Sequence, residues 1–187
     1  MLLKEETAIS NLIPEEVVDF MLEPYAEGCR YLKTASLEYI PQSYETKRII
    51  KIKGNLSIPD CYYGKEGNGS AHFNATEFIL CFNQLGYTLL AEGVRKNILP
   101  ELQMNSIEEF KEAQMKRIYI GKFNEIVFRK PINPKDFSGE VALERSMSMR
   151  NNVLYSMTIN FSDKNGGKAE GKSLIAIILD ESKSLTA

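Results

Sequence analysis

Three polar residues that could take part in catalysis lie close together, in the stretch His72-Phe73-Asn74-Ala75-Thr76-Glu77. Asn74 and Glu77 are three positions apart, so in a helix their side chains can share one face. The first turn of a helix has unpaired backbone N–H groups and the positive end of its dipole. In a cleft it could therefore hold a carbonyl oxygen, such as that of an acyl thioester, and stabilise its oxyanion. Asn74 and Glu77 also fit a simpler, compatible role as N-cap and capping-box partner.

His72 is the only histidine of the chain. A single histidine is more often a structural hydrogen-bonding residue than a catalyst. Beside a glycine-rich loop and a helix start, a neutral imidazole could also act as a general base on water or an amine.

Asn83 and Gln84 are two amides in the middle of an otherwise apolar run. Burying an amide without a partner costs about 1–3 kcal/mol, so each should be bonded to another polar group, a second chain or a substrate. At 100° per residue, Asn83 lies on the opposite side of the helix axis from Asn74. The two asparagines cannot both face one pocket of a single helix, and a site shared across a dimer interface would remove this conflict.

The element that must position these residues is one long helix within 72–97. Its sequence is apolar on almost every side, which is typical of a buried helix, and it is too short and too interrupted by amides to cross a bilayer. The preceding loop is rich in glycine and contains Tyr62, Tyr63 and Lys65. The two loop tyrosines, like Tyr25 nearer the N-terminus, fit simple packing with a solvated hydroxyl as well as a role in a site.

Patterns typical of strands flank the long helix on both sides. Short helices are expected from Pro14 to Leu22 and from Ser106 to Met115, while Gly54 indicates a bend or bulge in its strand. Tight turns are expected at 151–152 and 165–167. The expected strands are 31–40, 47–58, 116–120, 124–129, 139–149, 153–161 and 172–179.

These elements predict an α+β hot-dog fold, in which a curved antiparallel sheet wraps around one long central helix. Another α+β sandwich or a cystatin-like wrap is the alternative. Such a sheet covers only part of the helix, so a second subunit is expected to cover the remainder. We therefore expect a homodimer or higher homo-oligomer.

Composition limits the other classes of protein. The chain has 187 residues and a formal charge of −2, so we expect a single domain over 1–187 and no nucleic-acid partner. Segment 1–13 does not match a signal peptide and is expected to be a loose arm of a cytoplasmic protein that does not bind membranes. Cys29, Cys61 and Cys81 lack metal-binding spacing and are expected to be free thiols, and no metal site or cofactor is expected.

Several segments resemble one known family. The stretch HFNATEFILCFNQLGY is similar to the central helix of the FcoT-like fatty acyl thioesterases, and EPYAEGCRYL, FRKPINPKDFSG and FSDKNGGKAEG resemble its flanking segments. The resemblance implies a hot-dog fold and hydrolysis of fatty acyl thioesters of coenzyme A or an acyl carrier protein. It also implies a site of polar residues without a conventional acidic nucleophile. The positions carried over by motif are Tyr25, His72, Asn74, Glu77, Asn83 and a loop tyrosine, for which Tyr63 is favoured over Tyr62.

The resemblance also implies an alternative reaction. Relatives from isonitrile lipopeptide biosynthesis add the amine of glycine to the β-carbon of an α,β-unsaturated acyl-carrier-protein thioester, an aza-Michael addition with or without later hydrolysis. Both reactions polarise the thioester carbonyl and differ in the nucleophile. Asn83, Tyr62 and Lys65 are candidate substrate-binding residues, and Lys65 could hold the carboxylate of glycine, although a loop lysine is more often merely solvated.

In the expected mechanism, the helix N-terminus and Asn74 polarise the carbonyl, and Glu77 or His72 activates the nucleophile. Tyr25 and Tyr63 then orient the acyl group or donate a proton. A non-catalytic module that binds acyl chains or a carrier protein is a third reading.

A basic set of residues could dock an acidic carrier protein or the phosphates of coenzyme A, or could simply be solvated strand ends. It consists of Lys116, Arg117, Lys122, Arg129 and Lys130.

Overall fold

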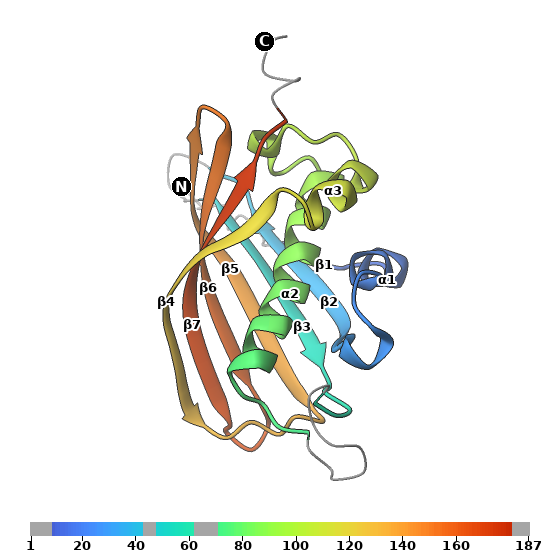
Figure 1. Ribbon diagram of the computed structural model, residues 1–187, viewed down its shortest axis with the longest axis vertical. Coiled ribbons are helices and arrows are strands. Elements are labelled where there is room, and N and C mark those ends of the chain that lie inside the picture. The colour runs from blue at the N-terminus through green and yellow to red at the C-terminus, as the bar shows by residue number, and fades with distance from the viewer. Residues whose placement is uncertain (1–8, 43–47, 62–70, 181–187) are drawn as a thin grey trace, which may run out of the picture.

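The computed structural model describes residues 9–42, 48–61 and 71–180. Within them, the long helix α2 (Ala75–Arg95) lies along the concave face of a seven-stranded antiparallel sheet (Figure 1). The strand order is β1-β2-β3-β5-β6-β7-β4. This is the hot-dog fold that the sequence predicts. The strands are β1 (Ile9–Leu12), β2 (Leu32–Ile40), β3 (Ile49–Leu56), β4 (Ile118–Lys130), β5 (Phe137–Met149), β6 (Asn152–Ser162) and β7 (Lys168–Ile178).

Two short helices and two 3-10 turns complete the described elements. They are α1 (Glu15–Leu22), η1 (Glu27–Cys29), η2 (Pro100–Leu102) and α3 (Ile107–Gln114). As expected, α3 is capped by Ser106, whose hydroxyl accepts a hydrogen bond from the backbone N–H of Glu109 at 3.2 Å. Figure 1 shows α1 beside β2 and α3 near the C-terminal end of α2.

Two expectations about the strands are wrong. Residues 9–12 form β1, paired antiparallel with β2, although segment 1–13 was expected to be a loose arm. Residues 116–120 and 124–129 were expected to form two strands, but β4 is continuous. Its pairing with β7 contains register shifts at Ile120/Lys122 and Phe123/Glu125. Such bulges accommodate an extra residue without ending a strand, so a polar interruption in the pattern does not break β4.

Gly54 allows the close approach of α2 to the sheet. It pairs regularly within β3, whereas the nearby register shift lies in β2 between Leu32 and Thr34, so the bend expected at Gly54 is not where the irregularity occurs. A Cβ at position 54 would lie 2.5 Å from a Leu32 side-chain carbon and 2.8 Å from one of Leu85. Only glycine therefore fits under the helix here.

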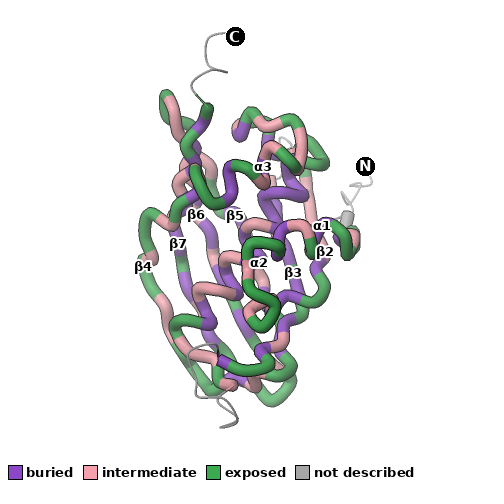
Figure 2. Tube along the Cα trace, turned by 45° about the vertical axis from the view of Figure 1, so that its right-hand side comes forward, coloured by how far each residue is buried: buried purple, intermediate pink, exposed green. Residues whose placement is uncertain are grey.

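One face of α2 is covered less than the rest. Ile79, Leu80, Asn83 and Tyr87 are half-buried, while most other positions from Glu77 to Val94 are buried (Figure 2). Their spacing places them along one side of the helix. No helix in the described part of the chain is long and apolar enough to span a membrane.

Candidate functional site

Asn74 caps α2 and fixes its first turn. Its side-chain oxygen accepts hydrogen bonds from the backbone N–H groups of Thr76 at 2.8 Å and Glu77 at 3.4 Å. The capping role expected for Asn74 is confirmed. Two of the N–H groups that a helix start leaves unpaired are therefore already bonded to Asn74, which reduces the number of backbone donors available to a substrate.

A short chain of contacts links Cys61, His72 and Asn74. The Asn74 amide nitrogen lies 2.8 Å from His72 Nε2, and His72 Nδ1 lies 3.6 Å from Cys61 Sγ. Because the Asn74 oxygen faces the helix, its NH2 group faces the imidazole and donates to Nε2. This pattern assigns the imidazole proton to Nδ1, on the side of Cys61. His72 could act as a base through Nε2 only after releasing Asn74.

Glu77 lies at the buried end of this region, beside two groups that stay protonated. Its side chain is completely buried. Burial, and then the charge of Glu77, raise the pKa of the Cys81 thiol. Burial also raises the pKa of Tyr31, with further contributions from Cys29 and Glu77. Cys81 is therefore a poor nucleophile, because the reactive form of cysteine is the thiolate.

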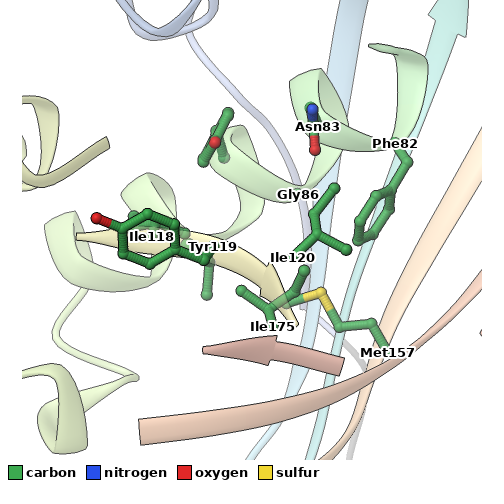
Figure 3. Close-up of a pocket in the computed structure, with 10 residues that line it drawn as sticks. Phe82, Asn83, Gly86, Ile118, Tyr119, Ile120, Met157 and Ile175 are labelled. Carbon is green, nitrogen blue, oxygen red and sulfur yellow. The ribbon is translucent and has the colours of Figure 1, made fainter. Parts of the chain in front are cut away.

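A pocket lies between α2 and the start of β4, and we call it the α2–β4 pocket (Figure 3). Its cavity volume is about 20 Å³, so the pocket is a narrow crevice. Apart from one amide and two phenol groups, its lining is apolar. The lining residues are Phe82, Asn83, Gly86, Tyr87, Leu90, Ile118, Tyr119, Ile120, Met157 and Ile175.

Two neutral hydrogen-bond donors of α2 line the α2–β4 pocket, and a third lies in their neighbourhood. Asn83 and Tyr87 are four positions apart on α2, so they share one face and both line the pocket. Tyr25 does not line the pocket but lies within electrostatic range of Tyr87: burial raises the pKa of Tyr25 first, followed by the charges of Tyr87 and Cys81. Burial also raises the pKa of Tyr87. Both phenols therefore stay protonated at neutral pH and can donate hydrogen bonds.

Tyr87 is a lining residue that the sequence analysis did not identify. The signal that could have revealed it is the four-residue spacing from Asn83 on a helix. Among the described residues, no hydrogen bond is made by the side chains of Asn83 or Tyr87, or by the hydroxyl of Tyr25. The donors of Asn83 and Tyr87 are thus available to a ligand in the pocket.

The expected site residues fall into two groups. His72, Asn74 and Glu77 gather at the start of α2, while Tyr25 lies with the half-buried face that carries Asn83. Asn74 and Asn83 line different hollows, as their opposite positions on the helix predict. The remaining candidates, Tyr62, Tyr63 and Lys65, lie outside the described residues.

Gln84 has a structural role. Its side-chain oxygen accepts hydrogen bonds from the backbone N–H groups of Tyr31 and Leu32, both at 2.9 Å, and its NH2 group donates to the carbonyl of Cys29 at 2.6 Å. The side chain is fully buried. The expectation that this amide is paired is confirmed, and the pairing fastens the segment after Tyr25 to α2.

The basic set from the sequence follows β4 and the turn before it. Two members already form ion pairs, Arg129 with Glu170 at 2.7 Å and Arg117 with Asp180 at 3.5 Å. Exposed pairs of this kind are weak and can exchange for other anions.

Comparisons with known proteins agree with this architecture. A family model described as the FcoT-like thioesterase domain matches residues 20–177. A protein of Mycobacterium marinum named (2E)-enoyl-[ACP] glycyltransferase is 32% identical over 177 residues, which cover 92% of this chain and 91% of that protein. A protein of the same name from Streptomyces coeruleorubidus is 28% identical over 171 residues, covering 88% of this chain and 96% of that protein.

One similar solved structure is the dehydratase domain of RzxB from Pseudomonas fluorescens. The TM-score is 0.53 at 13% sequence identity, and the match covers 89% of this chain. It covers 49% of the other chain, so this chain spans about half of that structure. At this identity the likeness concerns the fold alone.

Proposed function

Because the chain belongs to the FcoT-like thioesterase domain family, we propose that it adds the amine of glycine to a (2E)-enoyl thioester carried by an acyl carrier protein. The observation that carries this proposal is the similarity over about nine tenths of both chains to relatives named (2E)-enoyl-[ACP] glycyltransferase. From the sequence alone, hydrolysis of an acyl thioester was the primary expectation and glycine addition the alternative. The named relatives favour the alternative, and hydrolysis becomes the second candidate.

The α2–β4 pocket supplies the environment that such an acyl group requires. Its largely apolar lining suits an aliphatic chain, and Asn83, Tyr87 and Tyr25 offer neutral donors for the thioester oxygen. Addition at the β-carbon moves negative charge onto that oxygen as the enolate forms. A hydrogen-bond donor aimed at developing charge in a site that excludes water lowers the activation barrier by roughly 2.7–4 kcal/mol.

The second group of residues, at the start of α2, supports the handling of protons. Glu77 is buried near Cys81 on α2, and the thiol of Cys81 also influences Tyr25 electrostatically. The Glu77 carboxyl is therefore on the same helix as Asn83 and Tyr87, nearer its start. In our proposal the nitrogen–β-carbon bond forms as the double bond becomes an enolate, Glu77 takes the proton that the amine loses, and the same proton is returned to the α-carbon, which restores the thioester carbonyl. His72 and Asn74, which are bonded to each other at 2.8 Å, hold the helix start in place.

Mass spectrometry of a crotonyl acyl carrier protein tests the proposal. The carrier is incubated with the protein, with and without ¹⁵N-glycine, and the intact carrier and the released acids are weighed. We expect a carrier mass increased by one glycine only in the presence of both glycine and protein. The Asn83→Ala variant serves as the impaired enzyme and a tube without protein measures the spontaneous addition. Free crotonate with no adduct would favour hydrolysis, and an unchanged carrier in every tube would overturn both reactions for this substrate.

We also propose that two copies of the chain form a homodimer that covers the half-buried face of α2. Ile79, Leu80, Asn83 and Tyr87 lie on this face, and β4 stands at the edge of the sheet next to it. The opposite positions of Asn74 and Asn83 fit a site that two chains share. A second copy accounts for both observations.

Mixed variants test the shared site. If Asn74 of one chain works with Asn83 of its partner, mixing inactive Asn74→Ala and Asn83→Ala chains regenerates one intact site in each mixed dimer. Random pairing should then restore about a quarter of the wild-type activity. No recovery, with light scattering showing dimers, would place the site within one chain, and a monomeric mass would refute the dimer.

A further inference from the structure

Gly86 lies in the middle of α2, where glycine needs an explanation. Within a helix glycine is less favourable than alanine because its backbone loses more freedom on folding. Gly86 does not have the positive φ that would require glycine; Gly166 is the glycine with positive φ in the described part of the chain. Conformation therefore does not explain the residue.

Packing does not explain Gly86 either. A Cβ at this position would meet Phe82 Cε2 at 3.8 Å, an ordinary van der Waals contact. At Gly54, Gly139 and Gly171, which carry the sheet against α2, the same test gives nearest contacts of 2.5, 2.6 and 2.8 Å. Close approach of neighbouring atoms requires glycine at those three positions, whereas position 86 has room for a Cβ.

The room at Gly86 belongs to the α2–β4 pocket. Gly86 lines the pocket together with Asn83 and Tyr87. Figure 3 shows Asn83 and Gly86 on α2, with Ile120 and Met157 lining the same space. The absence of a side chain leaves bare backbone in the middle of that space. The donors of Asn83 and Tyr87 therefore continue directly into the apolar part of the pocket.

We propose that Gly86 is a specificity-determining residue that keeps the pocket open for the aliphatic part of the acyl group. This rests on the proposed function, in which the thioester oxygen meets Asn83, Tyr87 and Tyr25. The acyl chain then runs over the backbone of Gly86 towards the buried apolar wall. A side chain at position 86 shortens the longest chain that the enzyme accepts, and it leaves the reacting end of the substrate unchanged.

A series of (2E)-enoyl acyl carrier proteins from crotonyl to decenoyl tests the role of Gly86. For each chain length, kcat/KM for glycine addition is measured with the wild type, Gly86→Ala and Gly86→Leu. We compare kcat/KM for the longest accepted chain with kcat/KM for crotonyl, and we expect Gly86→Leu to lower this ratio by ~10-fold or more. That is the smallest effect typical of one misfitting methylene. The ratio for Gly86→Ala should lie between those of Gly86→Leu and the wild type. Ile120→Ala, which widens the pocket from β4, should shift the ratio in the opposite direction.

Gly28→Ala is the matched control, since a Cβ there has no neighbour within 4 Å and the residue does not line the pocket. It should leave the ratio unchanged. Equal losses at every chain length in Gly86→Leu, an unchanged ratio, or a wild type that accepts only crotonyl would each overturn the role of Gly86. Circular dichroism confirms that each variant is folded.

A binding measurement separates this inference from the reaction itself. Butyryl and decanoyl pantetheine amides have no reactive double bond or thioester, so calorimetry reports chain-length preference without chemistry. If Gly86→Leu loses affinity for the decanoyl amide and keeps it for the butyryl amide, the role of Gly86 stands even where glycine addition fails. If the wild type does not distinguish the two amides, or Gly86→Leu weakens both equally, the role is refuted whatever the reaction proves to be.

Discussion

Removing the Tyr87 hydroxyl should reduce catalysis while leaving the fold intact. Tyr87 lines the α2–β4 pocket, and burial raises its pKa, so its hydroxyl stays a proton donor. Since no hydrogen bond from this hydroxyl to another described residue is present, Tyr87→Phe leaves no protein group unpaired, and stability should change by no more than about 0.5 kcal/mol. The lost donor should raise the activation barrier by roughly 2.7–4 kcal/mol, which lowers kcat about 10²–10³-fold.

The assay compares kcat and KM for glycine addition to a crotonyl acyl carrier protein. A donor that acts on the developing enolate lowers kcat and kcat/KM equally, whereas one that only binds the ground state raises KM. Tyr25→Phe should also lower kcat, because in our proposal its hydroxyl donates to the same oxygen. The double variant should raise the activation free energy by less than the sum of the two single increases, as is typical of residues that act as a unit.

Tyr39→Phe is the control, because Tyr39 lies on β2 and does not line the pocket. It should keep wild-type rates. A Tyr87→Phe variant with near-normal kcat and unchanged unfolding would refute the donor role. A large loss of stability would show instead that the hydroxyl has a structural partner.

Four further changes test other parts of the molecule. Glu77→Gln should lower turnover at least ~100-fold if Glu77 is the base, and a near-normal rate in the same assay would remove that role. Asn74→Ala should lower the free energy of unfolding in urea by ~1 kcal/mol through loss of the cap, and unchanged stability would contradict that role. Burial alone would raise the pKa of Glu101, but the hydrogen bond from Arg48 lowers it. The free energy of unfolding should therefore fall as the pH drops from about 4.5 through that lowered pKa. Glu101→Gln should make this fall smaller in acid unfolding curves. Gly86→Ala should raise the free energy of unfolding by up to ~1 kcal/mol, and a destabilised variant would show that the side chain does not fit.

The fold could be predicted because its signals are local. The helix α2 is marked by an apolar run from Phe78 to Ala91 after the N-cap Asn74, and the capping of α3 by Ser106 is a four-residue pattern. Alternation of apolar and polar side chains marks β5 and β6. Each of these signals lies within one element, so one sequence is enough to detect it.

The assembly of the candidate site could be predicted only in part, because it depends on contacts between distant segments. The proximity of Tyr25 and Tyr87 requires the turn after α1 to pack on the middle of α2, and no spacing in the sequence encodes that contact. The three hydrogen bonds of Gln84 to residues 29–32 are of the same kind. The sequence shows that a buried amide needs partners, and only the structure identifies them.

The chemistry of the pocket lining itself separates the two candidate reactions. Among the described residues that line the α2–β4 pocket there are hydrogen-bond donors but no carboxylate, histidine or lysine. Water is a weak nucleophile that must lose a proton as it attacks, so hydrolysis needs a base beside the reacting carbon. An unprotonated amine attacks through its own lone pair and sheds its proton after the bond has formed. In our proposal, a pocket whose described lining offers donors and no base therefore suits addition of the unprotonated amine of glycine better than attack by water. In our proposal Glu77, which does not line the pocket, collects the amine's proton.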